Sequence, residues 1–174
     1  DYKTNDRSSY FYHNLVNAGI MIFSAESLDL LVEEGKYSYE KDVIVPLISR
    51  GNAYSYKSTE YAKDMGTPER YEMVKHDYQE GLCSSRNLVE KQKCVFLDRD
   101  GTINKYVGFL KSTDQFELLP KVSEAIKKIN QSGYLCVVVT NQPIIARGDA
   151  TVETLDDIHK KMETQLGNYH AFLT

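Results

Sequence analysis

The chain has 174 residues, 41% of them hydrophobic and 26% charged, which is the composition of an ordinary globular protein and excludes a disordered tail or a fibre. Its 21 basic and 25 acidic side chains give a formal charge of -4, so no basic field favours nucleic acid. No stretch approaches the roughly 18 consecutive apolar residues that cross a bilayer, and residues 1–10 lack the apolar core of a signal peptide. We therefore expect a cytoplasmic protein with neither a membrane nor a nucleic-acid partner.

The first half of the chain is expected to mix strands and helices. The elements predicted in order are a strand over 14–23, a helix over 24–35, a helix over 37–51 interrupted at Pro46, and an exposed strand over 53–58. Thr67 as an N-cap and Pro68 at a first helical position then predict a helix that runs to Gly81.

A polar stretch separates this half from a different pattern. We place a linker at 83–92, between one domain portion over 1–82 and another over 93–174. The elements predicted in the second portion are a strand over 93–97, a helix over 118–133, a strand over 134–140 and an amphipathic helix over 152–167. The continuous apolar runs of its strands indicate burial on both faces of a parallel sheet, with the helix between them as a right-handed crossover.

Two carboxylates follow the first strand of the second portion. Asp98 and Asp100 lie one residue apart in FLDRDGTIN, and residues i and i+2 of an extended chain point the same way. Open α/β sheets build their ligand sites at this end of their strands. One carboxylate can bind magnesium and attack phosphorus while the other moves a proton, and Gly101 with the Thr102 hydroxyl can form the turn that follows.

The next strand carries polar groups to the same edge of the sheet. It ends in Thr140 and Asn141, where a hydroxyl and backbone N–H groups can hold a phosphate. An isolated Asp-Gly pair is more often a solvated turn. Here the apolar strand before it, the crossover helix and the second strand together favour a phosphate site.

These segments resemble a known enzyme family. FLDRDGTIN followed by VVVTNQPIIARG is similar to the haloacid dehalogenase superfamily of phosphatases, within it the heptose 1,7-bisphosphate and histidinol-phosphate branch. The resemblance implies that Asp98 is the nucleophile, that Asp100 is the general acid and base, and that Asp98 and the Asp100 carbonyl ligate magnesium. It also implies that Thr140 binds the transferring phosphate, with Asn141 and Arg147 beside the substrate.

The resemblance also has departures. Heptose phosphatases usually read Ser-Gly where this chain has Pro143 and Ile144, which bears on loop shape and substrate choice. The superfamily's third and fourth motifs, a phosphate-neutralising cation and further acidic ligands, are not found before Thr174. Zinc, which the branch commonly binds just beyond HAF, is expected only if residues beyond Thr174 exist.

The first half resembles a second family. VNAGIMIF, YSYEKDVIVPLISRG and EYAKDMGTPERYEMVKHDY are similar to the carboxy-terminal part of sugar-1-phosphate nucleotidyltransferases of the guanylyltransferase type. The resemblance implies a magnesium ligand at Asp64, a sugar pocket along Asn17 and Gly19, and contacts to sugar hydroxyls or phosphate from Glu40 and Lys41. The alternative for Asp64 is a turn or helix-capping carboxylate. The Gly-rich triphosphate loop of that family is not found in the sequence.

The expected fold is a partial Rossmann-like α/β phosphatase domain with a parallel sheet, preceded by the end of an α/β nucleotidyltransferase domain. Together the resemblances imply a bifunctional enzyme of nucleotide-activated heptose synthesis that uses Mg²⁺, sugar phosphates and a nucleoside triphosphate, GTP by the resemblance. Two alternatives stay open: a phosphatase for another small molecule such as histidinol phosphate, and a non-catalytic remnant that binds sugar phosphates or a partner chain. The sequence does not define the oligomeric state.

Overall fold

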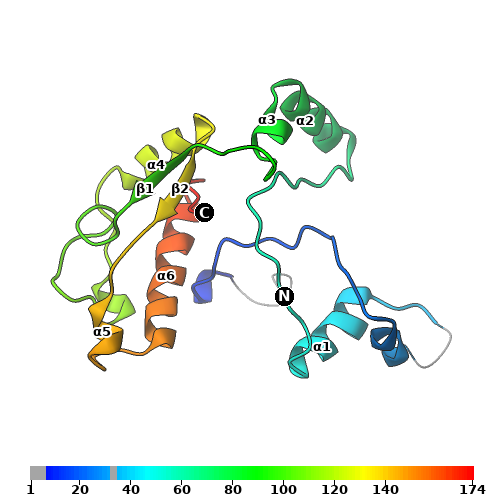
Figure 1. The fold of residues 1–174 in the computed structure, drawn as a ribbon, viewed down its shortest axis with the longest axis horizontal. Coiled ribbons are helices and arrows are strands. Elements are labelled where there is room, and N and C mark those ends of the chain that lie inside the picture. Colours follow the sequence, from blue (N-terminus) through cyan, green and yellow to red (C-terminus); the bar gives the residue numbers. More distant parts are fainter. Residues whose placement is uncertain (1–6, 32–34) are drawn as a thin grey trace.

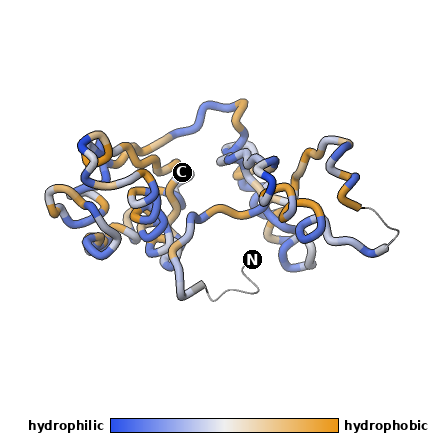
Figure 2. The backbone as a smooth tube through the Cα atoms, turned by 90° about the horizontal axis from the view of Figure 1, so that it is seen from below, coloured by the Kyte–Doolittle hydropathy of each residue, from blue (hydrophilic) through white to orange (hydrophobic). Residues whose placement is uncertain are grey.

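A computed structural model gives the structure of residues 7–31 and 35–174. In Figure 1, the strands and helices α4 and α6 lie together, and α1 and α2 lie apart from them. Figure 2 shows extended chain joining the two parts. No helix within the described residues is long and apolar enough to span a bilayer.

The described part of the first half forms short helices joined by extended chain. They are the 3-10 helices η1 (Arg7–Ser9) and η2 (Ala25–Leu30), the π-helix η3 (Tyr39–Ile44), and the α-helices α1 (Val45–Ser49), α2 (Pro68–Gln79) and α3 (Leu82–Ser85). The Thr67 hydroxyl accepts the N–H of Arg70 at the start of α2, and Gly81 has a φ of 76° just after its end, so this helix is confirmed.

Both strands predicted in the first half are wrong. Residues 14–23 and 53–58 have no strand partner, and Val16 and Ile22 are 89% and 98% exposed. An extended segment becomes a strand only by pairing its backbone with a neighbour, and the sheet formed by the described residues contains neither segment. The expected helix over 24–35 shortens to η2, and its residues 32–34 lie outside the described residues.

The second half forms a βαβ unit, in close agreement with its sequence pattern. Its elements are β1 (Cys94–Leu97), the 3-10 helix η4 (Thr113–Gln115), α4 (Val122–Gln131), β2 (Leu135–Val138), α5 (Pro143–Ala146) and α6 (Val152–Gly167). Strands β1 and β2 are parallel, with Cys94 opposite Leu135 and Leu97 opposite Val138. This confirms the α/β class with a parallel sheet.

The core covers one face of this sheet. Ile126 of α4, Cys136 of β2 and Ile158 of α6 belong to one buried cluster, so both helices pack against the same face. On the other face Phe96 is 70% exposed. The expectation of strands buried on both faces is therefore wrong for the described chain, because no described helix covers that second face.

Candidate active site

The predicted site residues meet where β1 and β2 end. The N–H of Val139 donates to the carbonyl oxygen of Leu97 (2.8 Å), so the strands stay paired up to the loops that carry Asp98 and Thr140. Gln142 joins these loops: its Nε2 donates to Thr140 Oγ1 (2.7 Å) and to Asp100 Oδ2 (2.7 Å). The sheet therefore brings Asp100 and Thr140 together, as expected.

The Asp100 carboxylate accepts N–H donors on every side. Arg99 donates from Nε to Oδ1 (3.1 Å) and from Nη2 to Oδ2 (2.9 Å), and Asn104 Nδ2 donates to Oδ1 (3.1 Å). With Gln142, these contacts occupy the four acceptor positions of an ionised carboxylate. Asn104 is fully buried, which fixes this side of the loop.

The electrostatic balance keeps Asp100 ionised. Burial by itself raises the pKa of this carboxyl, but the hydrogen bonds from Arg99, Gln142 and Asn104 outweigh burial and hold the pKa below its usual value. The Arg99 guanidinium, which is fully buried, adds charge attraction in the same direction. Asp100 is therefore a carboxylate at neutral pH in this arrangement.

Asp98 lies in a different environment. Its side chain is exposed, and its Oδ1 accepts the N–H of Arg99 (2.7 Å). The loop beyond turns back because the carbonyl oxygen of Arg99 accepts the N–H groups of Thr102 and Ile103, and Gly101 takes a φ of 85° that favours glycine. Asp98 is thus presented to solvent while Asp100 is held inside.

The other substrate-binding predictions lie around this edge. Thr102 and Asn141 are exposed. Arg147 follows α5, and its guanidinium lies over the ring of Phe109, 4.6 Å from the centroid. Ile144 is fully buried, so the departure from Ser-Gly in this loop adds an apolar anchor to the core.

Sequence reasoning missed three side chains of this site. Gln142 joins the strand ends, Arg99 pairs with Asp100, and Arg99 Nη1 lies 3.3 Å from His159 Nε2 on α6. Burial and then the neighbouring Arg99 charge lower the pKa of His159, so this ring is neutral and its Nε2 can accept from Arg99. The one available signal was an arginine between two aspartates directly after an apolar strand, because a buried arginine needs a carboxylate.

The residues predicted in the first half take local roles in this structure. Asp64 pairs with Arg70, and its Oδ1 accepts the N–H of Gly66 (2.8 Å). The Asn17 side chain accepts the N–H of Gly19 (2.9 Å) in an exposed turn. Glu40 and Lys41 are exposed on η3. Their roles at a nucleotidyltransferase site stay predictions.

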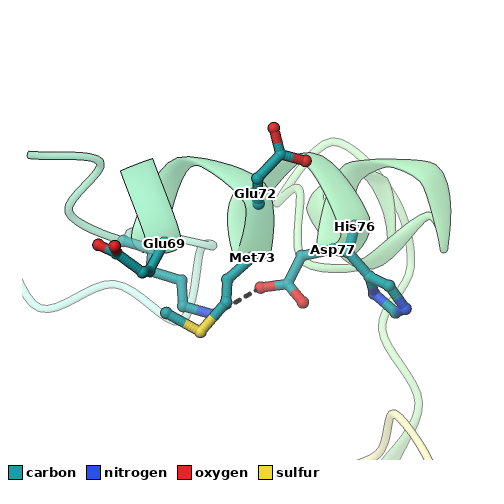
Figure 3. Close-up of a pocket in the computed structure, with 6 residues that line it drawn as sticks. Glu69, Glu72, Met73, His76 and Asp77 are labelled. Atoms are coloured by element: carbon teal, nitrogen blue, oxygen red, sulfur yellow. Dashed lines mark hydrogen bonds and ion pairs between the residues drawn. The ribbon is translucent and has the colours of Figure 1, made fainter. Parts of the chain in front are cut away.

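A shallow depression of about 490 Å³ lies along α2 (Figure 3). Asp77 accepts from Lys63 Nζ (2.7 Å) and from the Tyr61 hydroxyl (2.8 Å), and burial followed by this hydrogen bond raises the pKa of Tyr61 to about 12. Figure 3 shows Glu72 pointing away from Asp77 and His76. These side chains do not converge on one point, so we assign no site here.

The donor set at the sheet edge limits the metals that fit. Within the described residues, no group of three or more His, Cys, Asp or Glu side chains could hold a metal ion. Mg²⁺ is commonly held by one or two carboxylates, with water and substrate phosphate as the remaining ligands. The exposed Asp98 carboxylate fits that limited requirement, whereas a structural zinc site needs four protein ligands.

The fold and the site together define an α/β arrangement suited to phosphoryl chemistry, and comparison with known proteins points to one group. No protein-family model matches the chain. It is 40% identical over 75 residues to D-glycero-beta-D-manno-heptose-1,7-bisphosphate 7-phosphatase of Haemophilus ducreyi, covering 43% of this chain and 41% of that protein. The Salmonella typhi phosphatase of the same name is 40% identical over 81 residues, covering 47% and 43%.

Solved structures give similar coverage. D,D-heptose 1,7-bisphosphate phosphatase from B. bronchiseptica, crystallised with magnesium and phosphate, is 36% identical over 47% of this chain and 46% of that chain, with a TM-score of 0.46. The chain thus shares homology with heptose bisphosphate phosphatases over nearly half its length and spans about two fifths of the curated relatives it matches. These matches do not bear on the nucleotidyltransferase resemblance.

Proposed function

We propose that residues 93–174 are the amino-terminal part of a haloacid dehalogenase-type phosphatase domain that acts on a sugar bisphosphate of the heptose 1,7-bisphosphate kind. The observation that carries this proposal is the exposed Asp98 carboxylate beside an Asp100–Gln142–Thr140 network, on a chain homologous to heptose bisphosphate phosphatases. An exposed nucleophile next to a held carboxylate is what transfer through an aspartyl-phosphate requires.

The two carboxylates suit different steps. An oxygen of Asp98 attacks phosphorus and the bond from phosphorus to the sugar oxygen breaks, after which water hydrolyses the aspartyl-phosphate and releases inorganic phosphate. The leaving oxygen needs a proton, and the attacking water must lose one. Asp100 is ionised in this arrangement, so it can act as the base that takes the proton of the attacking water. To act as the acid that protonates the leaving oxygen, Asp100 must first lose one of its N–H contacts and take up a proton.

In the proposed enzyme, Asp98 and the carbonyl oxygen of Asp100 hold Mg²⁺, as the resemblance implies. When bound, the ion offsets negative charge on the phosphate and on the attacking carboxylate. Thr140 would hold the transferring phosphate, and Asn141, Thr102 and Arg147 would contact the rest of the substrate. For residues 1–82 the resemblance supports sugar-1-phosphate nucleotidyl transfer with GTP, with Asp64 as the metal ligand. The two activities on one chain would make neighbouring steps of nucleotide-activated heptose synthesis.

Phosphate release tests the phosphatase proposal. The full-length protein is incubated with heptose 1,7-bisphosphate and Mg²⁺, alongside Asp98→Asn and the control Asp114→Asn, which alters an exposed carboxylate on η4. We expect release from the wild type and the control but not from Asp98→Asn. Equal release from Asp98→Asn contradicts the nucleophile. Faster release from histidinol phosphate would assign the other branch, and stabilisation by phosphate without any release would assign a binding remnant.

A further inference from the structure

The buried Arg99 guanidinium is held from two directions. Of the hydrogen bonds that it makes with the described residues, two go to the two oxygens of Asp100 and one goes to Nε2 of His159. Asn104 and Gln142 each donate to one Asp100 oxygen, whereas Arg99 contacts both. Two parallel bonds fix the plane of the carboxylate relative to the guanidinium. The orientation of Asp100 therefore depends on what holds Arg99.

The group that holds Arg99 from the other side belongs to α6. His159 is 60 residues away in the sequence, and its Nε2 lies 3.3 Å from Arg99 Nη1. It follows Ile158, which is buried in the core together with Met162 and Leu166 of the same helix. These core contacts fix the helix relative to the sheet. His159 thus ties the loop that carries Asp100 to a rigid element.

The contact requires one particular form of the His159 ring. A guanidinium only donates hydrogen bonds, so Nε2 of His159 must accept. The ring proton of the neutral form then lies on Nδ1. A protonated ring would donate from both nitrogens and would place a second positive charge against Arg99. The contact therefore exists only with a neutral ring whose proton is on Nδ1.

The surroundings of His159 keep this ring neutral. Burial lowers its pKa first, and the charge of Arg99 lowers it further. The carboxylates of Asp156 and Glu163 on the same helix act in the opposite direction. Both carboxylates already contact His13, at 3.0 and 2.7 Å, and the charge of His13 also lowers the pKa of His159. The pKa of His159 therefore lies below its ordinary value, and the ring can accept from Arg99 at neutral pH.

We propose that His159 is a positioning residue for Asp100 and acts through Arg99. Its neutral ring holds the guanidinium, and the guanidinium holds both carboxylate oxygens in the orientation that proton transfer needs. The inference rests on the proposed function, in which Asp100 takes up and returns a proton. His159 touches neither the substrate nor the reacting atoms in this proposal. Its loss should therefore slow the proton-transfer steps and leave substrate binding nearly unchanged.

Nitrogen NMR of the full-length protein at pH 7 tests the contact itself. His159 should carry its proton on Nδ1, and the Nε–H of Arg99 should exchange slowly with solvent. His159→Gln should keep this slow exchange, because the Gln amide oxygen can reach the position of Nε2. His159→Asn is too short, so exchange should be at least about tenfold faster, since a hydrogen bond to a charged group is lost. A His159 proton on Nε2, a doubly protonated ring, or unchanged exchange in His159→Asn overturns the inference.

Phosphate release separates positioning from a purely structural role. In His159→Asn, kcat for heptose 1,7-bisphosphate should fall at least about tenfold, part of the roughly 100-fold to 10,000-fold effect of a positioned acid or base. KM should change little, and His159→Gln should restore most of kcat. His76→Gln, the same substitution at an exposed histidine of α2, should behave as the wild type.

The outcomes distinguish this inference from the proposed function. Equal loss of kcat in His159→Gln and His159→Asn, or a change confined to KM, overturns the positioning role. If the wild type releases no phosphate, the proposed function fails, and the ring proton and the Arg99 exchange rate still decide whether His159 holds the pair. The circular dichroism of each variant checks that the fold is retained.

Discussion

The pair of Arg99 and Asp100 should contribute strongly and asymmetrically to the stability of the second half. Asp100→Asn removes the negative charge beside a guanidinium that is fully buried and cannot lose its proton. The amide oxygen of the variant can still accept from Arg99, and His159 lies at 3.3 Å, but neither group compensates the charge. Removing one partner of a buried pair costs about 3–5 kcal/mol, and we expect the free energy of unfolding to fall by that amount.

Arg99→Met should cost less. The Asp100 side chain is 19% exposed and keeps the donors Gln142 and Asn104, so we expect a loss of about 1–3 kcal/mol, the cost of incompletely satisfying a polar group. In the double variant both charges are gone. Its loss should therefore be smaller than the sum of the two single losses by about 2 kcal/mol.

Urea unfolding at pH 7, followed by circular dichroism, measures this cycle. Hydrogen exchange at the amide of Val139, which bonds to Leu97, reports the same stability at the sheet itself. Asp114→Asn serves as the exposed control. The reasoning is refuted if Arg99→Met costs as much as Asp100→Asn, or if the coupling falls below about 0.5 kcal/mol.

The pair of Arg99 and Asp100 also determines the direction in which the stability of the second half changes with pH. The folded-state pKa of Asp100 lies below its ordinary value, so its contribution to stability is present above that ordinary value and is lost as pH falls through the folded one. The wild type should therefore lose this stability only in acid, and Arg99→Met should reduce that acid-dependent loss.

Three further predictions concern α6. Burial lowers the pKa of His13, but hydrogen bonds to two α6 carboxylates outweigh burial and raise this pKa above its ordinary value. The stabilising effect of His13 is therefore complete below the ordinary pKa and is lost as pH rises through the pKa of the folded state. NMR titration of His13 should show the raised pKa, and a value at or below the ordinary one would contradict its contacts with Asp156 and Glu163. Leu166→Ala, at a fully buried position, should cost about 2–5 kcal/mol in urea unfolding. Thr151→Ala should cost about 1 kcal/mol, because its hydroxyl caps α6 by accepting the N–H of Thr154 (3.1 Å).

The second half was predictable because its signals are local and agree with one another. The residues 152–167 expected to be helical are those of α6, and the Thr151 side chain caps it. Gly133, with a φ of 78°, follows the end of α4. Periodicity, caps and stops all specify the same elements there, and such agreement marks a sequence that encodes a single structure.

The first half was not predictable in the same way, because a strand depends on a partner that the pattern does not identify. The run 14–23 has the composition of a strand, yet Ile22 stays 98% exposed without a neighbour. Tyr12 and His13, which precede that predicted strand, and Asn14 at its start instead make the contacts that join the halves. His13 and Glu163 are 150 residues apart in the sequence, and the local spacing of residues cannot predict a contact between side chains so far apart.

The candidate site likewise contains some residues that the sequence could predict and others that it could not. Asp98, Asp100 and Thr140 could be placed from the sequence, since the carboxyl ends of paired parallel strands share one edge. Two contacts that hold this loop could not, because Gln142 reaches Asp100 and His159 reaches Arg99 only through the tertiary fold.

This tertiary arrangement has a consequence for proton transfer. All four acceptor positions of Asp100 are taken, so a proton can reach its carboxylate only when one donor withdraws. If Arg99 moved away from Asp100, its buried positive charge would lose its carboxylate partner. The Gln142 amide is partly exposed, so it can donate to water instead. Gln142 also donates to Thr140, the residue proposed to hold the phosphate. A phosphate bound at Thr140 competes for that same amide, so substrate binding is expected to free an oxygen of Asp100 when a proton has to move.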